Sequence, residues 1–559
     1  MSLIVGIDDF GKIIEKKLGF IDKSLFIKEI FDNEQIDVPV IVRPRRFGKT
    51  LNLSMLRYFL AAEVNGLKTQ GMFDNLNIAA QGDDYMQHQG KYPVIFISFK
   101  NVKGADFDEA YGELSKLMSK TYSQHYTLLT SDALHPHEKK IFESILNQTA
   151  SRENLLSSLA DLSEYLYRHH AIKPWLLIDE YDTPIQTGYL KDYYPDMIAI
   201  MRGLLGAALK GNESIHRGVV TGILRIAKEN LFSGLNNVKV YSVLDAQYAE
   251  CFGFTEAEVD KALKENNLAH LSVDIKAWYN GYHIGKSQIY NPWSIANCID
   301  EKGTLGPYWI HTSDNVLIKQ TMARADAALK IQFEAILEGK PVETLVDENI
   351  TFADLNGSGD KLWTLLLFAG YLTSTRTEMA GLEHQCLLSP PNKEVALLYP
   401  HIITAWFADS MTDTVYQSLL KDLTEGNLDY FLDTLKTFLF QSASYFDATE
   451  KQPEKFYHGF VLGLIISLPK THIIHSNKES GRGRYDVLLI PKDKTKLGII
   501  LEFKATRPGS DLQASAEEAL TQINQEGYAA ELKQQGIHKI LKVGLAFRGK
   551  EVMMASEPI

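Results

Sequence analysis

The sequence predicts an α/β protein with three parts: an N-terminal parallel sheet, a helical middle region and a smaller C-terminal α/β domain. An apolar strand near residue 40 runs through a short basic loop into a helix that begins at GKT. Apolar strands and helical stretches then alternate, which is typical of a parallel sheet. Near the C-terminus, two apolar runs flank a turn rich in Lys, Asp and Pro, and a helix and another strand follow them.

The first motif, VPVIVRPRRFGKTLNLSMLRYFL, covers residues 38–60. It has the order of strand, loop and helix that a phosphate-binding loop, or P-loop, requires. Backbone N–H groups at the start of the helix are expected to face the phosphates of a nucleotide, and Lys49 to reach the β- and γ-phosphates. The Thr50 hydroxyl is expected to bind Mg²⁺. The predicted nucleotide-binding residues of this loop are Arg46, Phe47, Gly48, Lys49 and Thr50.

The loop departs from the usual G-x-x-x-x-G-K-[ST] pattern at one position. The pattern places its first glycine at position 43, where this chain has Arg43. The loop must therefore turn without that glycine, with the help of Pro44. Two interpretations stay open: a loop that binds and hydrolyses ATP, and an inactive nucleotide site.

The second motif is an apolar strand that ends in two acids, within KPWLLIDEYDTPI at residues 173–185. Asp179 is placed to hold Mg²⁺, either directly or through water. Glu180 is placed to polarise the water that attacks the γ-phosphate. About 130 residues separate Lys49 from these acids, which leaves room for intervening strands and helices of one α/β domain.

Two further segments read as strands of the same sheet: YPVIFISF at residues 92–99 and HRGVVTGILRIA at residues 216–227. Thr221 falls at the expected end of the second strand. We expect Thr221 to sense the γ-phosphate, with Arg225 beyond it.

The C-terminal hairpin RYDVLLIPKDKTKLGIILEFKA, at residues 484–505, contains three charged residues within its apolar runs. A turn centred near residues 493–494 pairs residues whose numbers sum to about 988, so Asp486 faces Glu502 at about 5 Å between Cβ atoms. Lys504 lies on the same face as Glu502, because strand side chains alternate. Adjacent carboxylates in an apolar hairpin cost energy unless a cation lies between them, which predicts a divalent-metal site.

A metal held by two carboxylates, with a lysine nearby, suits activation of water for attack on a phosphodiester. The lysine would orient the nucleophile or stabilise the developing negative charge. The alternative is a buried ion pair between Lys504 and one carboxylate, without catalysis.

The hairpin resembles the active-site hairpin of PD-(D/E)xK nucleases, here in the form D-x15-E-x-K. Its neighbours follow the order of that fold: a helix at residues 455–468, the strand THIIHSN, the hairpin, a helix at residues 511–535 and the strand KILKVGLAF. The resemblance implies Mg²⁺ or Mn²⁺ at Asp486 and Glu502, with Lys504 as a catalytic residue. Its further implied residues are Glu454 as a metal ligand and Gln522 and Tyr528 beside the substrate phosphate; their six-residue spacing departs from the usual four.

The first half of the chain resembles the AAA-ATPase-like family, which carries RPRRFGKT, LLIDEYDTPI and TGILRIAKENLFSGLNN. Members of this family often end in a PD-(D/E)xK domain, and the resemblance extends over about residues 21–547. It implies a bacterial protein that uses ATP and Mg²⁺ and is similar to signal-transducing or mobile-element ATPases of the STAND type.

Length and composition agree with several domains. A chain of 559 residues with 45% hydrophobic content can bury two or three cores. We expect a P-loop domain at residues 1–245, a helical middle or lid region at 246–447 and a nuclease-like domain at 448–559, with a polar linker at 447–455.

Charge, cysteine content and the length of the apolar runs restrict the cellular location and the partners that we expect. Three widely spaced cysteines argue against a disulfide framework, and the apolar runs are too short to span a bilayer, so we expect a cytoplasmic protein without a membrane partner. The net charge of −12 argues against general nucleic-acid binding. Residues 470–504 nevertheless contain eight Lys or Arg and four acids, and Arg482 and Arg484 would form a basic rim that binds substrate.

The sequence therefore predicts an ATP-binding protein that couples nucleotide binding or hydrolysis to a metal-dependent nuclease acting on DNA or RNA. The alternative is a nucleotide-dependent signalling or scaffold protein whose nuclease-like domain only binds nucleic acid or a partner. The sequence leaves the choice between DNA and RNA, and a homo-oligomeric state, open.

Overall fold

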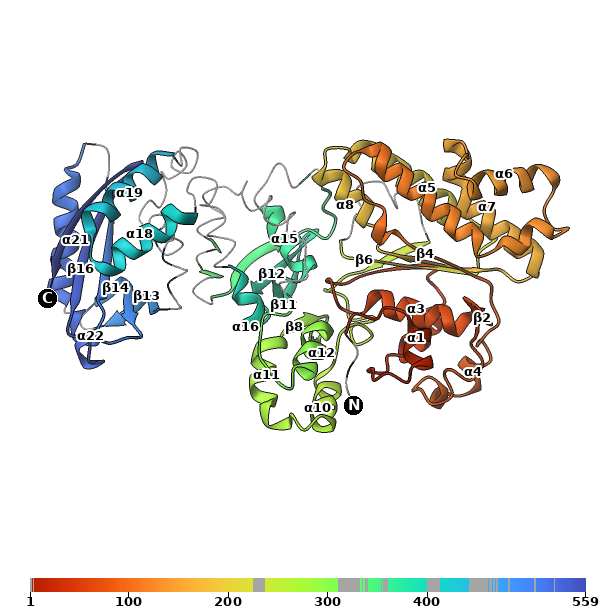
Figure 1. Cartoon of the computed structure of the whole chain (residues 1–559), viewed down its shortest axis with the longest axis horizontal. Helices are drawn as coiled ribbons and strands as arrows, with labels where there is room; N and C mark the ends of the chain where they lie inside the picture. The colour runs from red at the N-terminus through yellow and green to blue at the C-terminus, as the bar shows by residue number, and fades with distance from the viewer. Residues whose placement is uncertain are drawn as a thin grey trace. The chain divides into compact units, whose positions relative to one another are not determined.

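The computed structural model (Figure 1) describes residues 3, 5–224, 237–309, 332–333, 335–336, 340–352, 354, 360–399, 413–441, 461, 465, 468, 471–480, 483–506, 509–526 and 528–558. The chain divides into two compact units. The first unit contains Met1–Leu317 and Glu343–Val395, and the second contains Ile318–Val342 and Ala396–Ile559.

The described part of the first unit has a five-stranded parallel sheet in the order β4-β5-β6-β1-β7. Its strands are β1 (Val38–Val42), β4 (Val94–Ser98), β5 (Trp175–Asp179), β6 (Arg217–Gly222) and β7 (Val238–Tyr241). Every residue of β1, β5 and β6 is buried, which explains why these segments read as continuous apolar runs. The strands predicted around residues 40, 95, 177 and 219 are confirmed.

Helices cover both faces of this sheet. Figure 1 shows α1 and α3 on one side of the sheet and α5, α7 and α8 on the other. The helices of this part are α1 (Phe10–Glu15), α2 (Leu25–Asp32), α3 (Lys49–Leu60), α4 (Asp83–Met86), α5 (Phe107–Ser123), α6 (Pro136–Leu146), α7 (Arg152–His170), α8 (Thr183–Leu190) and α9 (Tyr194–Leu209), and β2 (Glu63–Val64) pairs with β3 (Leu67–Lys68).

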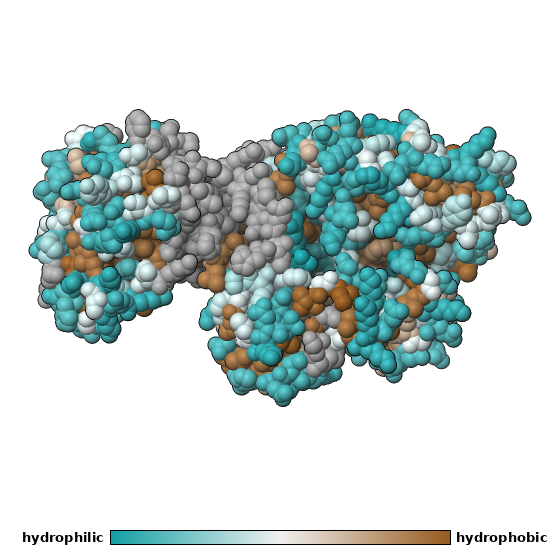
Figure 2. Space-filling view, viewed as in Figure 1, coloured by the Kyte–Doolittle hydropathy of each residue, from teal (hydrophilic) through white to brown (hydrophobic). Residues whose placement is uncertain are grey.

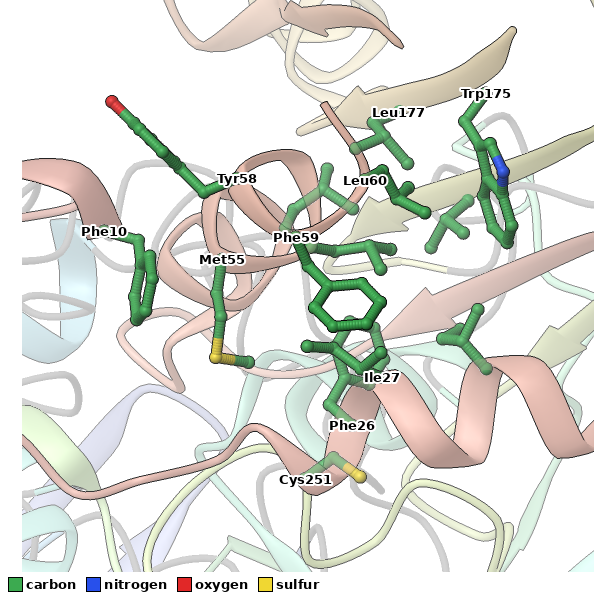
Figure 3. Packing of buried hydrophobic residues seen from close by; sticks show 14 of the residues in the cluster. Phe10, Phe26, Ile27, Met55, Tyr58, Phe59, Leu60, Trp175, Leu177 and Cys251 are labelled. Atoms are coloured by element: carbon green, nitrogen blue, oxygen red, sulfur yellow. The ribbon is translucent and has the colours of Figure 1, made fainter. Parts of the chain in front are cut away.

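One hydrophobic cluster joins the sheet to the helices on its α3 side. Phe59 and Leu60 of α3 pack with Ile27 of α2 and with Trp175 and Leu177 of β5 (Figure 3). All five side chains are fully buried. This packing fixes α3, and hence the loop before it, against the strand that carries the predicted acids.

The rest of the first unit is partly helical, as predicted, but it also contains strands that the sequence did not reveal. Thr255 caps α10 with a capping box, as its position in FTEAEV predicts. The elements are α10 (Glu256–Glu265), α11 (Ser272–Tyr279), β8 (Tyr282–Ile284), β9 (Ser287–Ile289), α12 (Pro292–Asp300), β10 (Val342–Val346), α15 (Asp360–Ala369), β11 (Thr373–Ala380), β12 (Glu383–Ser389) and α16 (Lys393–Ala396), with β8 paired to β9 and a sheet β10-β12-β11.

The second unit contains a five-stranded sheet, over its described residues, in the order β13-β14-β15-β16-β17. β15 pairs with β16 in parallel, and the other three pairs are antiparallel. Its elements are α18 (Asp413–Glu425), α19 (Leu428–Gln441), β13 (His472–Ser480), β14 (Gly483–Pro491), β15 (Gly498–Ala505), α21 (Leu512–Glu526), α22 (Ala529–Gln534), β16 (Ile540–Arg548) and β17 (Glu551–Pro558).

The hairpin register predicted from the sequence is confirmed. Val487 faces Leu501 and Leu488 faces Ile500, so facing residue numbers sum to 988. The single helix predicted over residues 511–535 is wrong in one respect, because α21 ends at Glu526 and α22 begins at Ala529. β17 was not predicted, and most of the expected linker and helix at residues 447–468 lie outside the described residues.

The surface and the cysteines agree with the compositional expectations. Hydrophilic residues cover most of the visible face of the described residues (Figure 2). Cys251, Cys298 and Cys386 are free thiols, and all three are buried. Among the described helices, none combines the length and the apolar character needed to cross a membrane.

Gly544 of β16 lets α21 approach the sheet, which yields a test of the C-terminal packing. A Cβ at this position would lie 2.6 Å from the backbone nitrogen of Leu520 and would also overlap the carbonyl oxygen of Ala516. Because these are backbone atoms of a packed helix, we expect Gly544→Ala to lower the free energy of unfolding by about 1–3 kcal/mol or more.

Gly498→Ala is the matched control, since a Cβ there meets only the side chains of Ile537 at 3.0 Å and Leu532 at 3.1 Å. These side chains can move, so we expect Gly498→Ala to lose less free energy of unfolding than Gly544→Ala. Urea unfolding measures the free energy of unfolding of each variant. Hydrogen exchange in β15 and β16 then shows whether the loss is located in this sheet. Equal stability losses in the two variants would contradict the packing described for Gly544.

Candidate functional site

The predicted nucleotide-site residues meet at the carboxyl edge of the parallel sheet. Ser98 is the last residue of β4, Asp179 is the last residue of β5, and Thr221 is the penultimate residue of β6. Ser98 and Asp179 face each other in the register. Because parallel strands end at the same edge, residues far apart in the sequence come together beside the loop that follows β1.

The Asp179 carboxylate is the centre of this edge. Its Oδ2 accepts hydrogen bonds from the Thr50 hydroxyl at 2.9 Å and from the Ser98 hydroxyl at 3.0 Å, and its Oδ1 accepts one from the Thr221 hydroxyl at 2.8 Å. Asp179 is 0% exposed. Burial raises its pKa above the usual value, the neighbouring Glu180 charge raises it further, and the three hydroxyls act in the opposite direction.

Lys49 begins α3 and is turned back onto its own loop. Its Nζ donates to the carbonyl oxygens of Arg43 and Pro44, each at 2.9 Å. The side chain is 6% exposed, and burial lowers its pKa. These carbonyls hold the ammonium in place at the N-terminal end of α3, where a phosphate would offer stronger, charged acceptors.

Arg43 explains how the loop turns without its usual first glycine. Its Nη1 donates to the carbonyl oxygens of Val42, at 2.8 Å, and of Tyr241 and Ser242, at 3.1 and 2.8 Å. The side chain is 0% exposed, and burial lowers its pKa to about 10. Arg43 therefore points away from the loop into the carbonyls after β7, where it anchors the start of the loop.

The loop reverses direction through two residues with positive φ. Arg46 has φ 67° and Gly48 has φ 81°, and a Cβ at Gly48 would meet nothing within 4 Å. The space above Gly48 is therefore open to a ligand. The Phe47 side chain is buried, so only the backbone of that residue is available to a phosphate.

Glu180 follows Asp179 with φ 51° and accepts a hydrogen bond from the Thr183 hydroxyl at 3.2 Å. Positive φ is strained for a glutamate, and such strain is concentrated at functional positions. Burial lowers the pKa of Arg46, while the Glu180 charge opposes that shift. Glu180 and Arg46 are therefore close enough to interact electrostatically at the edge of the sheet.

Asp182 is a site residue that the sequence analysis missed. Its Oδ2 accepts the backbone N–H groups of Ile223 at 2.8 Å and Leu224 at 2.9 Å, directly after β6. Asp182 is 1% exposed, and burial raises its pKa. It fixes the direction in which the chain leaves β6, just before Arg225, which lies outside the described residues. Its position in the sequence, three residues after Asp179, could have identified it as a candidate site residue.

Residues from the following part of the first unit hold the phosphate-binding loop. The Trp309 Nε1 donates to the Arg45 carbonyl oxygen at 3.1 Å, and the Arg46 guanidinium lies 4.2 Å from the centre of the Trp293 ring. The Gly253 N–H donates to the Phe47 carbonyl oxygen at 3.2 Å. These contacts hold three consecutive loop residues.

A second site lies in the C-terminal hairpin, where Asp486 and Glu502 are cross-strand neighbours. The Asp486 N–H donates to Glu502 Oε2 at 3.4 Å, and the Phe503 N–H donates to Asp486 Oδ2 at 2.8 Å. Glu502 is 3% exposed. Two carboxylates are therefore held side by side on adjacent strands, as the register arithmetic predicts.

Gln522 of α21 joins two of the predicted residues. Its side-chain amide donates to Glu502 Oε1, and its carbonyl oxygen accepts a hydrogen bond from Lys504 Nζ at 2.8 Å. One amide thus spaces the lysine from the carboxylate and orients both. Lys504 Nζ is thus linked to the Glu502 carboxylate through this amide.

Tyr528 occupies a different environment from the one its predicted role requires. It is 0% exposed and belongs to a hydrophobic cluster with Leu488, Ile500, Ile523 and Leu532. α21 ends at Glu526 and Tyr528 caps α22, so Tyr528 does not continue the face of α21 that carries Gln522. Glu454, Arg482 and the side chain of Arg484 lie outside the described residues.

The donor atoms at both sites suit a hard divalent cation. Carboxylate and hydroxyl oxygens are the ligands that Mg²⁺ and Mn²⁺ prefer. Within the described ranges, no group of three or more His, Cys, Asp or Glu side chains has the arrangement of a metal site. Asp486 and Glu502 place two carboxylates at one site, and Asp179 and Thr50 place a carboxylate and a hydroxyl at the other.

Two family models match the chain, and each covers one of the two candidate sites. Residues 4–232 match the family model described as "Predicted AAA-ATPase", and residues 452–557 match the model of the PD-(D/E)XK nuclease superfamily. The chain joins an AAA-ATPase-like domain to a PD-(D/E)XK nuclease superfamily domain. The resemblance inferred from the motifs is thereby confirmed, as are the N-terminal parallel sheet and the C-terminal sheet domain.

A similar protein matches almost the whole chain. The "Uncharacterized protein in vnfD 5'region" of Azotobacter chroococcum mcd 1 is 25% identical over 545 residues, which cover 96% of this chain and 94% of that protein. The similarity therefore includes the AAA-ATPase-like domain, the PD-(D/E)XK domain and the region between them.

Glu394 of α16 gives a test of burial near the phosphate-binding loop of the AAA-ATPase-like domain. Its carboxylate is 0% exposed, and burial raises its pKa from 4.5 to about 7. Between these two values the folded protein binds more protons than the unfolded chain. We therefore expect the free energy of unfolding to fall as pH rises through this window, by up to about 1.4 kcal/mol per pH unit, and to level off above it.

The variant Glu394→Gln has no carboxyl group to titrate, so this contribution should be missing from its pH profile. Urea unfolding of both proteins between about pH 5 and pH 8 measures the difference. A stability difference between the two proteins that stays constant over this range would contradict the buried, titrating carboxyl.

Proposed function

We propose that this protein binds ATP and couples its binding or hydrolysis to a metal-dependent nuclease that cleaves nucleic-acid phosphodiesters. In this proposal, residues 1–245 bind the nucleotide, residues 246–447 form the connecting or lid region, and residues 448–559 carry out cleavage. The observation that carries the proposal is that Asp486 lies beside Glu502, and that Gln522 joins Glu502 to Lys504, in a region that matches the PD-(D/E)XK nuclease superfamily.

In the proposed nucleotide site, Lys49 exchanges its loop carbonyls for the β- and γ-phosphates, and the backbone of residues 46–48 faces the phosphates. Mg²⁺ bound with ATP neutralises phosphate charge. Thr50 and Asp179, which share a hydrogen bond at 2.9 Å, would hold this ion directly or through water. Glu180 accepts the proton of the attacking water, and Thr221 and Arg225 sense the γ-phosphate.

In the proposed nuclease site, Asp486 and Glu502 hold Mg²⁺ or Mn²⁺, and Glu454 adds a third carboxylate. The metal supplies Lewis acidity and lowers the pKa of its bound water. Lys504 orients the attacking water and stabilises the negative charge that develops on the phosphate. Gln522, Arg482 and Arg484 contact the substrate backbone. The buried position of Tyr528 supports a packing role for its ring instead.

Calorimetry of Mg²⁺–ATP binding tests the N-terminal half of the proposal. The change Lys49→Ala removes the ammonium that reaches the phosphates, so we expect at least about a tenfold loss of affinity relative to wild type. The matched control is Lys210→Ala, since Lys210 is an exposed residue that follows α9. Identical binding heats for wild type and Lys49→Ala would rule out ATP binding at this loop.

Cleavage assays with Mn²⁺ or Mg²⁺ on single- and double-stranded DNA and RNA, with and without ATP, test the C-terminal half. We expect Asp486→Ala and Lys504→Ala each to lower cleavage by about a hundredfold or more, and to leave ATP binding unchanged. The control Lys492→Ala changes an exposed residue just after β14. Undiminished cleavage by both site variants would remove the nuclease assignment.

A binding assay in EDTA separates the proposal from its rival. Wild-type protein that binds nucleic acid in EDTA and cleaves none in Mn²⁺ would favour a nucleotide-dependent signalling or scaffold protein whose nuclease-like domain only binds nucleic acid or a partner.

A further inference from the structure

Glu394 lies about 345 residues after the phosphate-binding loop in the sequence, yet its hydrogen-bond partners contact that loop. Its Oε1 accepts the backbone N–H of Trp309 at 2.5 Å, and its Oε2 accepts the Ser294 hydroxyl at 2.7 Å. Glu394 and Ser294 are 0% exposed, and Trp309 is 1% exposed. A carboxylate is buried at such a position only when it is hydrogen-bonded, so both bonds constrain the groups that donate them.

Each of these two donors is connected to the phosphate-binding loop, Trp309 by its own side chain and Ser294 through the adjacent Trp293. The side chain of Trp309 donates from Nε1 to the Arg45 carbonyl oxygen at 3.1 Å. Ser294 lies in the first turn of α12, directly after Trp293, whose ring lies 4.2 Å from the Arg46 guanidinium. One carboxylate therefore links the two tryptophans that contact consecutive residues of the loop.

The segment before Glu394 makes a related contact. A Cβ at Gly281 would overlap the carbonyl oxygen of Pro391, so the chain at Pro391 packs directly on Gly281. The next residue, Tyr282, places its ring 5.0 Å from the Phe47 ring in an edge-to-face arrangement. Residues 391–394 thus contact Trp309 and Ser294 on one side and Gly281 on the other. These groups, or their sequence neighbours Trp293 and Tyr282, contact Arg45, Arg46 and Phe47.

We infer that Glu394 is a positioning residue for the phosphate-binding loop, acting through Trp309, Ser294 and Trp293. It holds the Arg45 carbonyl and the Arg46 guanidinium at the positions that let the backbone of residues 46–48 face a triphosphate. The inference rests on the proposed binding of ATP at this loop. It adds a residue outside both nucleotide motifs to the machinery of that site.

Glu394 also lies where the chain leaves the first compact unit. α16 spans Lys393–Ala396, and the chain passes from the first compact unit to the second between Val395 and Ala396. The segment that bonds to the neighbours of the loop therefore continues in sequence into the second unit.

Three substitutions separate positioning from a merely structural role. The change Glu394→Ala leaves the Trp309 N–H and the Ser294 hydroxyl without their acceptor. Glu394→Gln keeps an oxygen for the Trp309 N–H and an amide that can donate to the Ser294 hydroxyl, so it should rescue the site. Trp309→Phe removes the indole N–H that holds the Arg45 carbonyl, together with part of a buried ring, and leaves the Glu394 carboxylate in place; it serves where Glu394→Ala fails to fold.

The control is Glu138→Ala. Glu138 also accepts a backbone N–H, from His135, and a side-chain donor, Arg168, each at 2.7 Å, but it belongs to α6 rather than to the segments that contact the loop.

Two measurements on the full-length protein complete the test. Calorimetry should show about a tenfold loss of Mg²⁺–ATP affinity in Glu394→Ala and Trp309→Phe, and less than about a threefold change in Glu394→Gln and Glu138→Ala. Hydrogen exchange without nucleotide should be faster over residues 44–52 in Glu394→Ala and Trp309→Phe only.

The outcomes distinguish this inference from the proposed function. If wild type binds no Mg²⁺–ATP, the proposed nucleotide site fails, while the exchange of residues 44–52 still decides whether Glu394 positions the loop. If wild type binds Mg²⁺–ATP and Trp309→Phe and Glu394→Ala match it in both affinity and exchange, the positioning role is overturned and the nucleotide site stands.

Discussion

The buried Asp179 carboxylate, with its three hydroxyl donors, is the interaction on which the first unit depends. Thr50, Ser98 and Thr221 reach it from α3, β4 and β6, which are far apart in the sequence. A carboxylate without water needs such partners, because an unpaired buried charge is strongly unfavourable. Only the strand order β4-β5-β6-β1 brings all three together, so the topology of the sheet and the chemistry of its edge support each other.

Distant segments complete both sites in the same way. Arg43 anchors the start of the phosphate-binding loop to carbonyls after β7, and Trp309 holds the loop at Arg45. In the second unit, Gly544 admits α21 close to the sheet, and α21 brings Gln522 between Glu502 and Lys504. In each case a local motif supplies the reactive groups and a packed element from elsewhere sets their geometry.

The sequence predicted the main elements of the fold wherever the pattern was strong. Fully apolar strands such as β1 and β5 were clear, since helices cover both faces of that sheet. The short strands β8 and β9, the sheet β10-β12-β11 and β17 were missed. β11 and β17 bury few of their residues and therefore lack the apolar alternation that marks a strand. The break near Gly527 was missed because Ala, Gln and Glu on both sides favour a helix.

By itself, the sequence determined the groups whose neighbours are local. The positions of Lys49 and Thr50 at the start of a helix, of Asp179 and Glu180 at the end of a strand, and of Asp486 opposite Glu502 follow from spacing and hairpin register. Only the tertiary structure decided that Arg43 turns inward, that Ser98 and Asp182 lie at the carboxyl edge of the parallel sheet, that Tyr528 packs in the core and that Glu394 bonds to Trp309 and Ser294. The physical reason is that periodicity and spacing describe one element at a time, whereas these placements depend on how elements pack across hundreds of residues.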